Sequence, residues 1–166
     1  MSLFTPDDYY KRVDCIPFEY LLEHDVRCIL IDRDNTCVPR TTKRVPSEIL
    51  AWFNYVQHEL HIPIYVVSNN VHVRQVQKSA HELGCQALSH AMKPSPRVLT
   101  ALLRKLDIKP QHALMIGDQI FTDIVAGRLA QTQTILVRPQ SKRDLWYTYF
   151  LRVLEFFIVR NKNFKG

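Results

Sequence analysis

Four short polar motifs hold the side chains of this sequence that could carry out chemistry. They supply several carboxylates, a serine hydroxyl and a lysine ammonium. Carboxylates that lie close together repel one another, and a divalent cation such as Mg²⁺, which prefers oxygen ligands, relieves that repulsion. A carboxylate held against a metal-bound phosphate can attack phosphorus and form an acyl phosphate. The motifs are Asp32-Arg33-Asp34-Asn35-Thr36, Ser68-Asn69-Asn70, Lys93-Pro94 and Gly117-Asp118-Gln119-Ile120-Phe121-Thr122-Asp123.

The spacing of Asp32 and Asp34 suits acid–base chemistry beside a nucleophile. Two residues apart, both side chains lie on the same side of an extended strand end. Asp34 can then protonate a leaving group and later deprotonate the water that hydrolyses the intermediate. Ser68 and Lys93, which come from other parts of the chain, can hold phosphoryl oxygens and offset developing negative charge.

Each motif taken alone has an ordinary structural explanation. A D-x-D pair occurs often in loops, a Ser or Asn after a strand commonly caps a helix, and a lone lysine is usually solvated. Gly117-Asp118 alone could form a turn. The order of all four motifs, each near the end of a predicted strand, favours a catalytic site over these explanations.

The segments that must position these motifs alternate between strand and helix patterns. Short apolar runs predict buried parallel strands, with longer stretches of helical spacing between them. This alternation indicates an α/β fold with one open parallel sheet, in which ligands bind beyond the carboxyl ends of the strands. Strands are predicted over residues 27–32, 63–68, 113–117 and 134–137, with a weaker one at 86–88, and helices over 46–60, 71–83, 95–106 and 119–130.

Length, charge and cysteine usage narrow the class of protein. The 166 residues fit one domain that needs no metal or disulfide staple, and the net charge of +6 favours an anionic partner. The four cysteines form no C-x-x-C pair, which argues against a structural zinc site or a redox dithiol. Because no signal peptide and no apolar run of membrane-spanning length stand out, we expect a cytoplasmic protein with free thiols.

Together the four motifs resemble those of the haloacid dehalogenase (HAD) superfamily of phosphohydrolases. The D-x-D-N-T, S-N-N, K-P and G-D-Q-x-x-T-D forms are similar to its subfamily IIIA, and within it to the YqeG-type group, which is related to mitochondrial phosphatidylglycerophosphate phosphatases. The resemblance covers roughly residues 16–139. It implies a Rossmann-like three-layer α/β/α sandwich around a central parallel sheet, and phosphatase activity that depends on Mg²⁺.

The resemblance also implies a role for each motif residue. Asp32 would be the nucleophile that becomes phosphorylated, and Asp34 the general acid and base. Asp123 would support the metal site or orient Lys93. The implied assignment is catalytic for Asp32, Asp34, Ser68 and Lys93, substrate-binding for Thr36, Asn69 and Lys93, metal-binding for Asp32, Asp34 and Asp118, and supporting for Asp123.

Two positions depart from the family pattern. Between the two aspartates the family commonly has an apolar residue, and this chain has Arg33. Alternation along a strand places its side chain on the side opposite both carboxylates, so Arg33 must reach solvent or an acidic partner. Cys37 stands where the family usually has leucine, and we expect it to pack as a small apolar residue.

The sequence leaves no room for a cap domain over the predicted site. Residues 37–45 form only a short loop, and residues 70–93 hold one helix and one short strand. We therefore expect an open site that suits a bulky substrate, or one that a neighbouring subunit covers in a homo-oligomer. Arg40, Lys43 and Arg44 lie in the short loop and fit either a solvated surface or a role in guiding the substrate.

The C-terminal segment differs from the rest of the chain in both apolarity and charge. We expect one domain over residues 1–140, with a helical lead-in at 1–25, followed by an amphipathic aromatic and basic helix and tail at 141–166 that is not a separate domain. Residues 138–166 contain seven Lys and Arg but only two Asp and Glu. Such a helix suits an anionic membrane surface, and it suits packing on its own domain or across a dimer equally well.

These features predict a Mg²⁺-dependent phosphomonoester hydrolase that acts through an aspartyl-phosphate. The resemblance and the apolar tail favour phosphatidylglycerophosphate as the substrate and a cytoplasmic protein peripheral to the inner face of the membrane. A soluble sugar phosphate or nucleotide is the alternative within the enzyme class. A non-catalytic assembly or nucleic-acid-binding protein is the alternative of another class, but nucleic acid is disfavoured because the basic excess lies in the tail.

Overall fold

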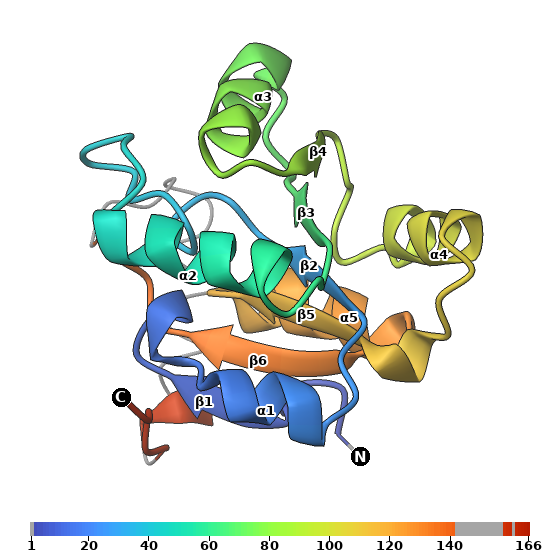
Figure 1. Cartoon of the computed structure of the whole chain (residues 1–166). Coiled ribbons are helices and arrows are strands. Elements are labelled where there is room, and N and C mark those ends of the chain that lie inside the picture. Colours follow the sequence, from blue (N-terminus) through green and yellow to red (C-terminus); the bar gives the residue numbers. More distant parts are fainter. Residues whose placement is uncertain (1, 142–157, 161) are drawn as a thin grey trace.

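A computed structural model of the chain describes residues 2–141, 158–160 and 162–166. Its centre is a sheet of six strands, all parallel, in the order β1-β6-β5-β2-β3-β4 (Figure 1). The order along the sheet reverses between β2 and β5, so a crevice forms at their carboxyl ends. The strands are β1 (Asp8–Tyr10), β2 (Cys28–Ile31), β3 (Ile64–Val67), β4 (Gln86–Leu88), β5 (Ala113–Gly117) and β6 (Gln133–Val137).

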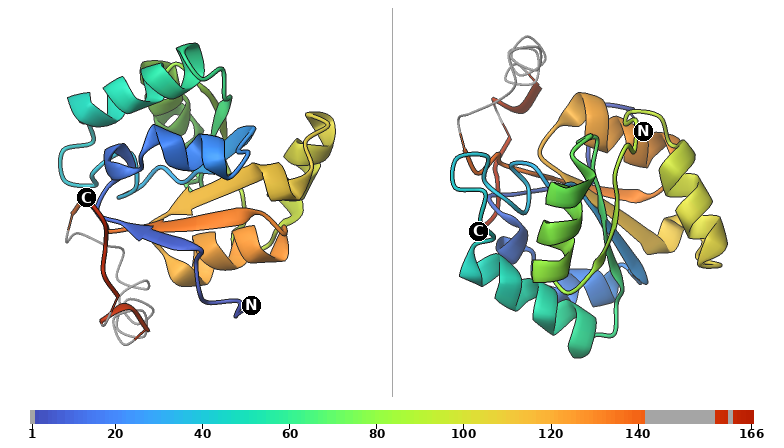
Figure 2. Two further views of the ribbon diagram at one scale, coloured as in Figure 1. Left: turned by 60° about the horizontal axis from the view of Figure 1, so that its bottom comes forward. Right: turned by 90° about the horizontal axis from the view of Figure 1, so that it is seen from above.

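Helices cover both faces of this sheet and complete three layers (Figure 2). The helices α1, α2 and α3 contribute buried side chains to one core, and α4 and α5 contribute to the core on the opposite face. Between strands and helices the described chain holds only short loops and no inserted cap. The helices are α1 (Phe18–Glu23), α2 (Ser47–His58), α3 (Val73–Glu82), α4 (Arg97–Lys105) and α5 (Val125–Leu129).

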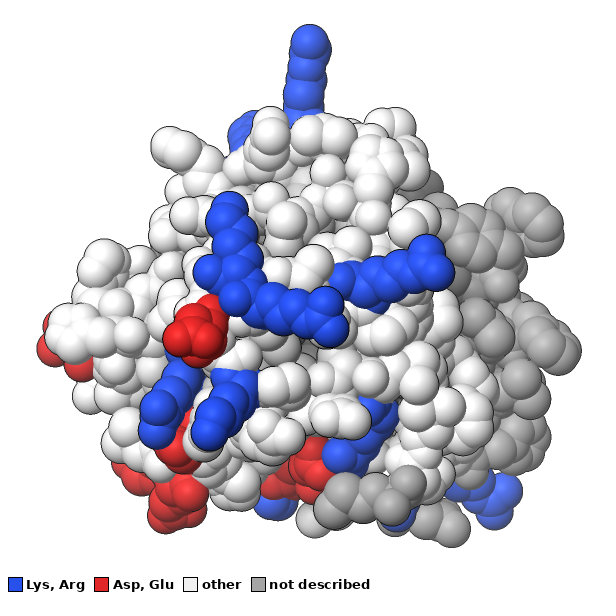
Figure 3. Space-filling model, turned by 90° about the vertical axis from the view of Figure 1, so that its right-hand side faces the viewer, with Lys and Arg blue, Asp and Glu red and all other residues white. Residues whose placement is uncertain are grey.

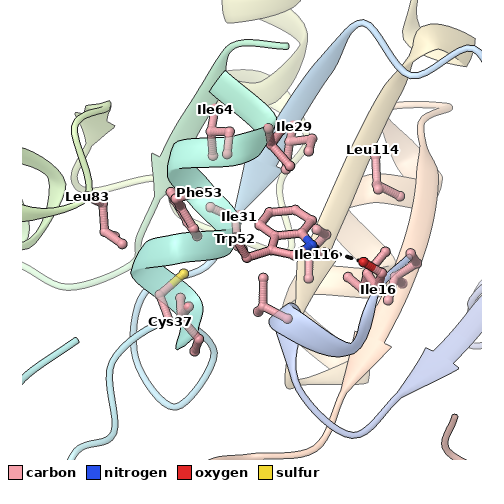
Figure 4. Packing of buried hydrophobic residues seen from close by; sticks show 14 of the residues in the cluster. Ile16, Ile29, Ile31, Cys37, Trp52, Phe53, Ile64, Leu83, Leu114 and Ile116 are labelled. Carbon is pink, nitrogen blue, oxygen red and sulfur yellow. Dashed lines mark hydrogen bonds between the residues drawn. The ribbon is translucent and has the colours of Figure 1, made fainter. Parts of the chain in front are cut away.

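Alternation along the buried strands builds the two cores. In β2, Ile29 and Ile31 point to the α2 side, while Cys28 and Leu30 point to the α4 side. A strand that is buried on both faces consists of consecutive apolar residues, and this pattern makes it predictable from the sequence. On the α2 side, the indole of Trp52 donates a hydrogen bond of 2.9 Å to the Ile16 carbonyl, so its one polar group is satisfied (Figure 4).

The predicted α/β fold is confirmed, and the five predicted strands are present within one residue at each end. The first 25 residues differ from the expected helical lead-in, because β1 is a strand that pairs with β6 at the sheet edge. Three residues carry too little pattern to reveal a strand, and its formation depends on the hydrogen bonds that β6 offers. The predicted helix over 119–130 divides into a π-helical turn, Ile120–Ile124, and α5.

The end of the chain returns to the sheet. Lys165 forms a parallel bridge with Tyr10 of β1, and its ammonium pairs with Asp8 at 2.5 Å. Phe164 is 7% exposed and lies edge-on against the Tyr9 ring. Most of the helix predicted after residue 141 lies outside the described residues. Within the described part of the chain, no helix is long and apolar enough to cross a membrane.

Candidate active site

A cavity of about 450 Å³ lies at the carboxyl ends of β2 and β3, where the strand order predicts a ligand site. It brings together residues from all four sequence motifs. Of the predicted site residues, Thr36 and Asp118 are the two that do not line it. The lining residues are Asp32, Asp34, Arg40, Ser68, Asn69, Asn70, Val71, His72, Lys93, Gln119, Thr122 and Asp123.

The ammonium of Lys93 stands between two carboxylates at the bottom of this cavity. Its Nζ lies 2.6 Å from Oδ1 of Asp32 and 2.7 Å from Oδ1 of Asp123. The side chains of Lys93 and Asp123 are 1% and 2% exposed, whereas that of Asp32 is 11% exposed. All three residues line the cavity, and the Asp32 carboxylate is the most exposed of them.

Burial and neighbouring charge set the protonation of this trio. Burial raises the pKa of Asp32 to about 6, the Lys93 charge opposes this, and the carboxylates of Asp123 and Asp34 add to it. Burial alone would lower the pKa of Lys93, but Asp123 and Asp32 raise it above its ordinary value. Lys93 is therefore a permanent cation, and Asp32 is ionised at neutral pH.

The backbone around Asp123 explains two features of its motif. The Ile124 amide donates to the Gln119 carbonyl at 3.3 Å, five residues back, and this wide turn carries Asp123 towards Lys93. The second carboxylate oxygen of Asp123 accepts the Gln119 amide at 3.1 Å. A Cβ on Gly117 would lie 2.3 Å from the Asp123 side chain, so only glycine leaves room for it.

Asp34 lines the cavity and is held from two sides. Its Oδ1 accepts a hydrogen bond from Nη1 of Arg33, and its Oδ2 accepts the Asn70 side-chain amide at 3.1 Å. Arg40 also approaches Oδ2, at 3.9 Å. Arg33 thus meets an acidic partner, but the expectation that it is kept apart from both carboxylates is wrong for Asp34. The arginine side chain is long enough to fold back onto its neighbour.

Asn69 positions the backbone of Lys93. Its side-chain amide donates to the Lys93 carbonyl at 2.8 Å, and its carbonyl oxygen accepts the Lys93 amide at 2.7 Å. Asn69 thus supports Lys93, and it also lines the cavity, where its predicted contact with substrate stays a prediction. Ser68 is buried and lines the cavity, and its Oγ accepts the Asn70 amide at 3.1 Å.

Thr36 and Asp118 form a buried pair beside the cavity. The Thr36 hydroxyl donates to Oδ1 of Asp118 at 3.2 Å, which holds the aspartate rather than a ligand in the cavity. Cys37 is fully buried, and its Sγ donates to the Asp32 carbonyl at 3.1 Å. Burial raises the pKa of the Cys37 thiol, so it is a neutral packed group, as the sequence predicts.

The carboxylates beside the cavity fit a divalent cation. Asp32, Asp118 and Asp123 each offer one oxygen that lies within 4.8 Å of the other two. Three carboxylates beside one lysine leave an excess of two negative charges, which a divalent cation would balance, and oxygen donors suit Mg²⁺. This group contains Asp32 and Asp118, two of the three residues that the sequence predicts as metal ligands.

From the sequence, no role in the site was predicted for Asn70. Asn70 belongs to the Ser68-Asn69-Asn70 motif, so its place after β3 was a usable signal. Arg40, for which the sequence left a solvated surface or a role in guiding the substrate open, lines the cavity.

Comparison with known proteins agrees with this geometry. Residues 90–147 match a family model described as HAD-hydrolase-like. The chain is 32% identical, over 93% of its length and 88% of the relative's, to "Probable phosphatase YqeG" of Bacillus subtilis (strain 168).

The chain belongs to the HAD-like hydrolase family.

Solved structures share the HAD-like fold of this chain at low sequence identity. The structure of a predicted HAD-like family hydrolase from Porphyromonas gingivalis has a TM-score of 0.57 and 10% identity, covering 78% of this chain and 98% of that one. An uncharacterized protein from Listeria monocytogenes serotype 4b also has a TM-score of 0.57, with 15% identity over 72% of this chain and 86% of that one. At such identities the likeness establishes the fold alone.

Proposed function

We propose that this HAD-like hydrolase is a divalent-metal-dependent phosphatase that cleaves phosphomonoesters through a phosphorylated Asp32. The observation that carries the proposal is the accessible Asp32 carboxylate, fixed 2.6 Å from a buried Lys93 ammonium at the bottom of a 450 Å³ cavity. A nucleophile beside a permanent cation is what attack on a phosphate anion requires. The name of the Bacillus subtilis relative supports the same activity.

The metal-binding residues of the proposal are Asp32 and Asp118, with Asp34 beside them. A bound Mg²⁺ would neutralise charge on the phosphoryl oxygens and on the carboxylates around it. Thr36 orients Asp118 through its hydroxyl, and Gln119 and Lys93 hold Asp123 in its supporting place.

The proposed reaction uses the remaining groups in two steps. A carboxylate oxygen of Asp32 attacks phosphorus, the bond from phosphorus to the ester oxygen breaks, and Asp34 donates the proton that the leaving oxygen takes. Asp34 then removes a proton from water, which attacks phosphorus and releases phosphate and the Asp32 carboxylate. Lys93 and the Ser68 hydroxyl hold phosphoryl oxygens in both steps.

For the substrate, we propose a bulky phosphate ester, with phosphatidylglycerophosphate as the leading candidate. The described chain has no inserted cap over the cavity, and Arg40 adds positive charge at its rim. The apolar and basic segment over 141–166, which would meet an anionic membrane, lies largely outside the described residues. A soluble sugar phosphate or nucleotide is the competing substrate within the same mechanism.

Two assays test the activity and the substrate separately. Hydrolysis of p-nitrophenyl phosphate is measured with Mg²⁺ and with EDTA, for the full chain and for Asp32→Asn. Turnover that requires Mg²⁺ and disappears in Asp32→Asn supports the proposal, and turnover that survives the substitution refutes the assigned nucleophile. A short-chain phosphatidylglycerophosphate is then compared with a panel of soluble phosphates, and equal or better turnover of a soluble one refutes the lipid substrate.

A further inference from the structure

A second cavity, of about 440 Å³, lies on the other side of Arg33 from the catalytic cavity. It is formed by Arg33, by the loop before α2 and by α3, which both lie at the upper end of the molecule in Figure 1. Its volume falls in the range of small-molecule binding pockets. The lining residues are Arg33, Lys43, Arg44, Gln75, Lys78, Ser79 and Glu82.

The charge of this cavity is strongly positive. Four of its lining residues are cationic and only Glu82 is anionic. Among the described residues, Lys43, Arg44 and Lys78 make no salt bridge. Cations gathered around one hollow repel each other, and a bound anion would relieve that repulsion.

Arg33 forms a fixed part of the cavity lining, and one of its nitrogens can still donate a hydrogen bond. It is 6% exposed, its Nε donates to Oγ of Ser79 at 2.9 Å, and its Nη1 donates to Asp34. Within the part of the chain that the structure describes, Nη2 of Arg33 makes no hydrogen bond. A planar guanidinium fixed at two nitrogens is preorganised to offer its remaining donor to an anion.

We propose that this cavity is a second anion site, separate from the catalytic cavity, which binds the phosphate group of a small phosphorylated molecule or free phosphate. Arg33 contributes a directed donor, and Lys43, Arg44 and Lys78 contribute the surrounding charge. Phosphate suits this set better than a monoanion, because one dianion can face several cations at once.

A ligand in the second cavity can influence the catalytic site through Arg33. The same guanidinium that lines the second cavity holds the Asp34 carboxylate that lines the first. An anion on Nη2 would hold Arg33 more firmly in the orientation that fixes Asp34. This part of the inference rests on the proposed function, whereas binding at the second cavity does not.

The test is a titration of the full chain with inorganic phosphate, followed residue by residue by NMR. We expect saturable shifts at the amides of residues 43–44 and 75–82 and at the side chain of Arg33, besides those at the catalytic cavity. In Arg44→Gln/Lys78→Gln, the affinity for phosphate measured from the shifts at the second cavity should fall at least tenfold. The shifts at the catalytic cavity should remain. In Lys93→Met, the shifts at the catalytic cavity should weaken while those at the second cavity remain. The two variants therefore distinguish failure of one site from failure of the other.

A matched control removes two basic residues elsewhere. Arg97→Gln/Arg104→Gln changes exposed arginines of α4, which packs on the opposite face of the sheet. Figure 3 shows the side of the molecule on which α4 lies, where Lys and Arg side chains gather. This control should leave both sets of shifts unchanged. The inference is overturned if wild type shows no saturable shifts at the second cavity, if they survive Arg44→Gln/Lys78→Gln, or if the control weakens them equally.

A parallel titration with methylphosphonate, a phosphate-ester mimic that cannot be hydrolysed, separates the two sources of the ligand. Binding of both probes at the second cavity supports the phosphate group of a small ester. Binding of inorganic phosphate alone supports free phosphate. Binding of a single-stranded RNA with higher affinity than either, at the same residues, would overturn the small-ligand proposal in favour of a polymer.

Discussion

Asp123 fixes the position of the Lys93 ammonium: its Oδ1 lies 2.7 Å from Nζ, and neither side chain is more than 2% exposed. A buried charge without a partner is costly, so each of these two groups depends on the other. The same ammonium reaches Asp32, which makes Asp123 a positioning residue for the proposed nucleophile.

Asp123→Asn should lower kcat for p-nitrophenyl phosphate by roughly 10–100-fold, the usual cost of removing a group that orients a metal or catalytic site. The neutral side-chain amide at position 123 cannot pair with the Lys93 ammonium, which would then pair more strongly with Asp32. The Asp32 carboxylate would be a weaker nucleophile as a result. KM should change less than kcat. Steady-state kinetics at saturating Mg²⁺ measure this, with the exposed Asp107→Asn as the control. Wild-type kcat in Asp123→Asn would contradict the positioning role.

Asp32→Asn should stabilise the metal-free protein at neutral and alkaline pH. The pKa of Asp32 is about 6 in the folded chain, above the ordinary 3.8, so the folded protein holds this proton more tightly than the unfolded one. Its carboxylate therefore lowers stability above about pH 6 and has no effect well below pH 4.

Urea denaturation in EDTA at several pH values between 4 and 8 measures this difference. The gain from Asp32→Asn should grow from pH 4 to pH 7 and then level off. A constant difference, or a loss of stability at pH 8, would show that the carboxylate is not strained by burial.

Gly117→Ala should damage both stability and activity. Its Cβ would lie 2.3 Å from the Asp123 side chain, so Asp123 must move away from Lys93. Overpacking of this kind costs about 1–3 kcal/mol. Gly127→Ala is the control, because its Cβ would crowd Thr134 and Met115 instead. Both variants should have a lower melting temperature, but only Gly117→Ala should have a lower kcat per folded molecule. Equal activity per folded molecule would refute the argument.

Phe164→Ala should destabilise the domain although only two residues follow Phe164 in the sequence. The ring packs against Ile120, Ile124 and Leu136, with the Arg138 guanidinium 4.7 Å from its centroid. Loss of such a buried ring costs about 3–5 kcal/mol. Chemical denaturation measures this, with Leu129→Ala, at a half-exposed position, as the control. An unchanged midpoint would show that the tail is not part of the folded unit.

Signals that are local in the chain could be read without the structure. The runs at 28–31, 64–67 and 113–117 are apolar because those strands are buried on both faces, and the polar motifs follow them because parallel strands collect ligand groups at one edge. The approximate positions of Asp32, Asp34, Ser68 and Lys93 around one cavity were therefore predictable.

Contacts between distant segments were not predictable, because no short window of sequence contains both partners. Strand β1 exists because β6 offers it hydrogen bonds, and Asn69 is occupied because the Lys93 backbone lies beside it. Arg33 meets Ser79 across 46 residues only when α3 packs beside the β2 loop.

The α/β architecture, the edge of the sheet that carries the chemistry and the groups gathered there all follow from patterns in the amino-acid sequence. Which of those groups face the cavity, and which hold another in place as Thr36 holds Asp118 and Asp123 holds Lys93, depends on the folded structure. Periodicity records burial, which is local, whereas a buried polar group takes the partner that three-dimensional packing brings within hydrogen-bonding distance.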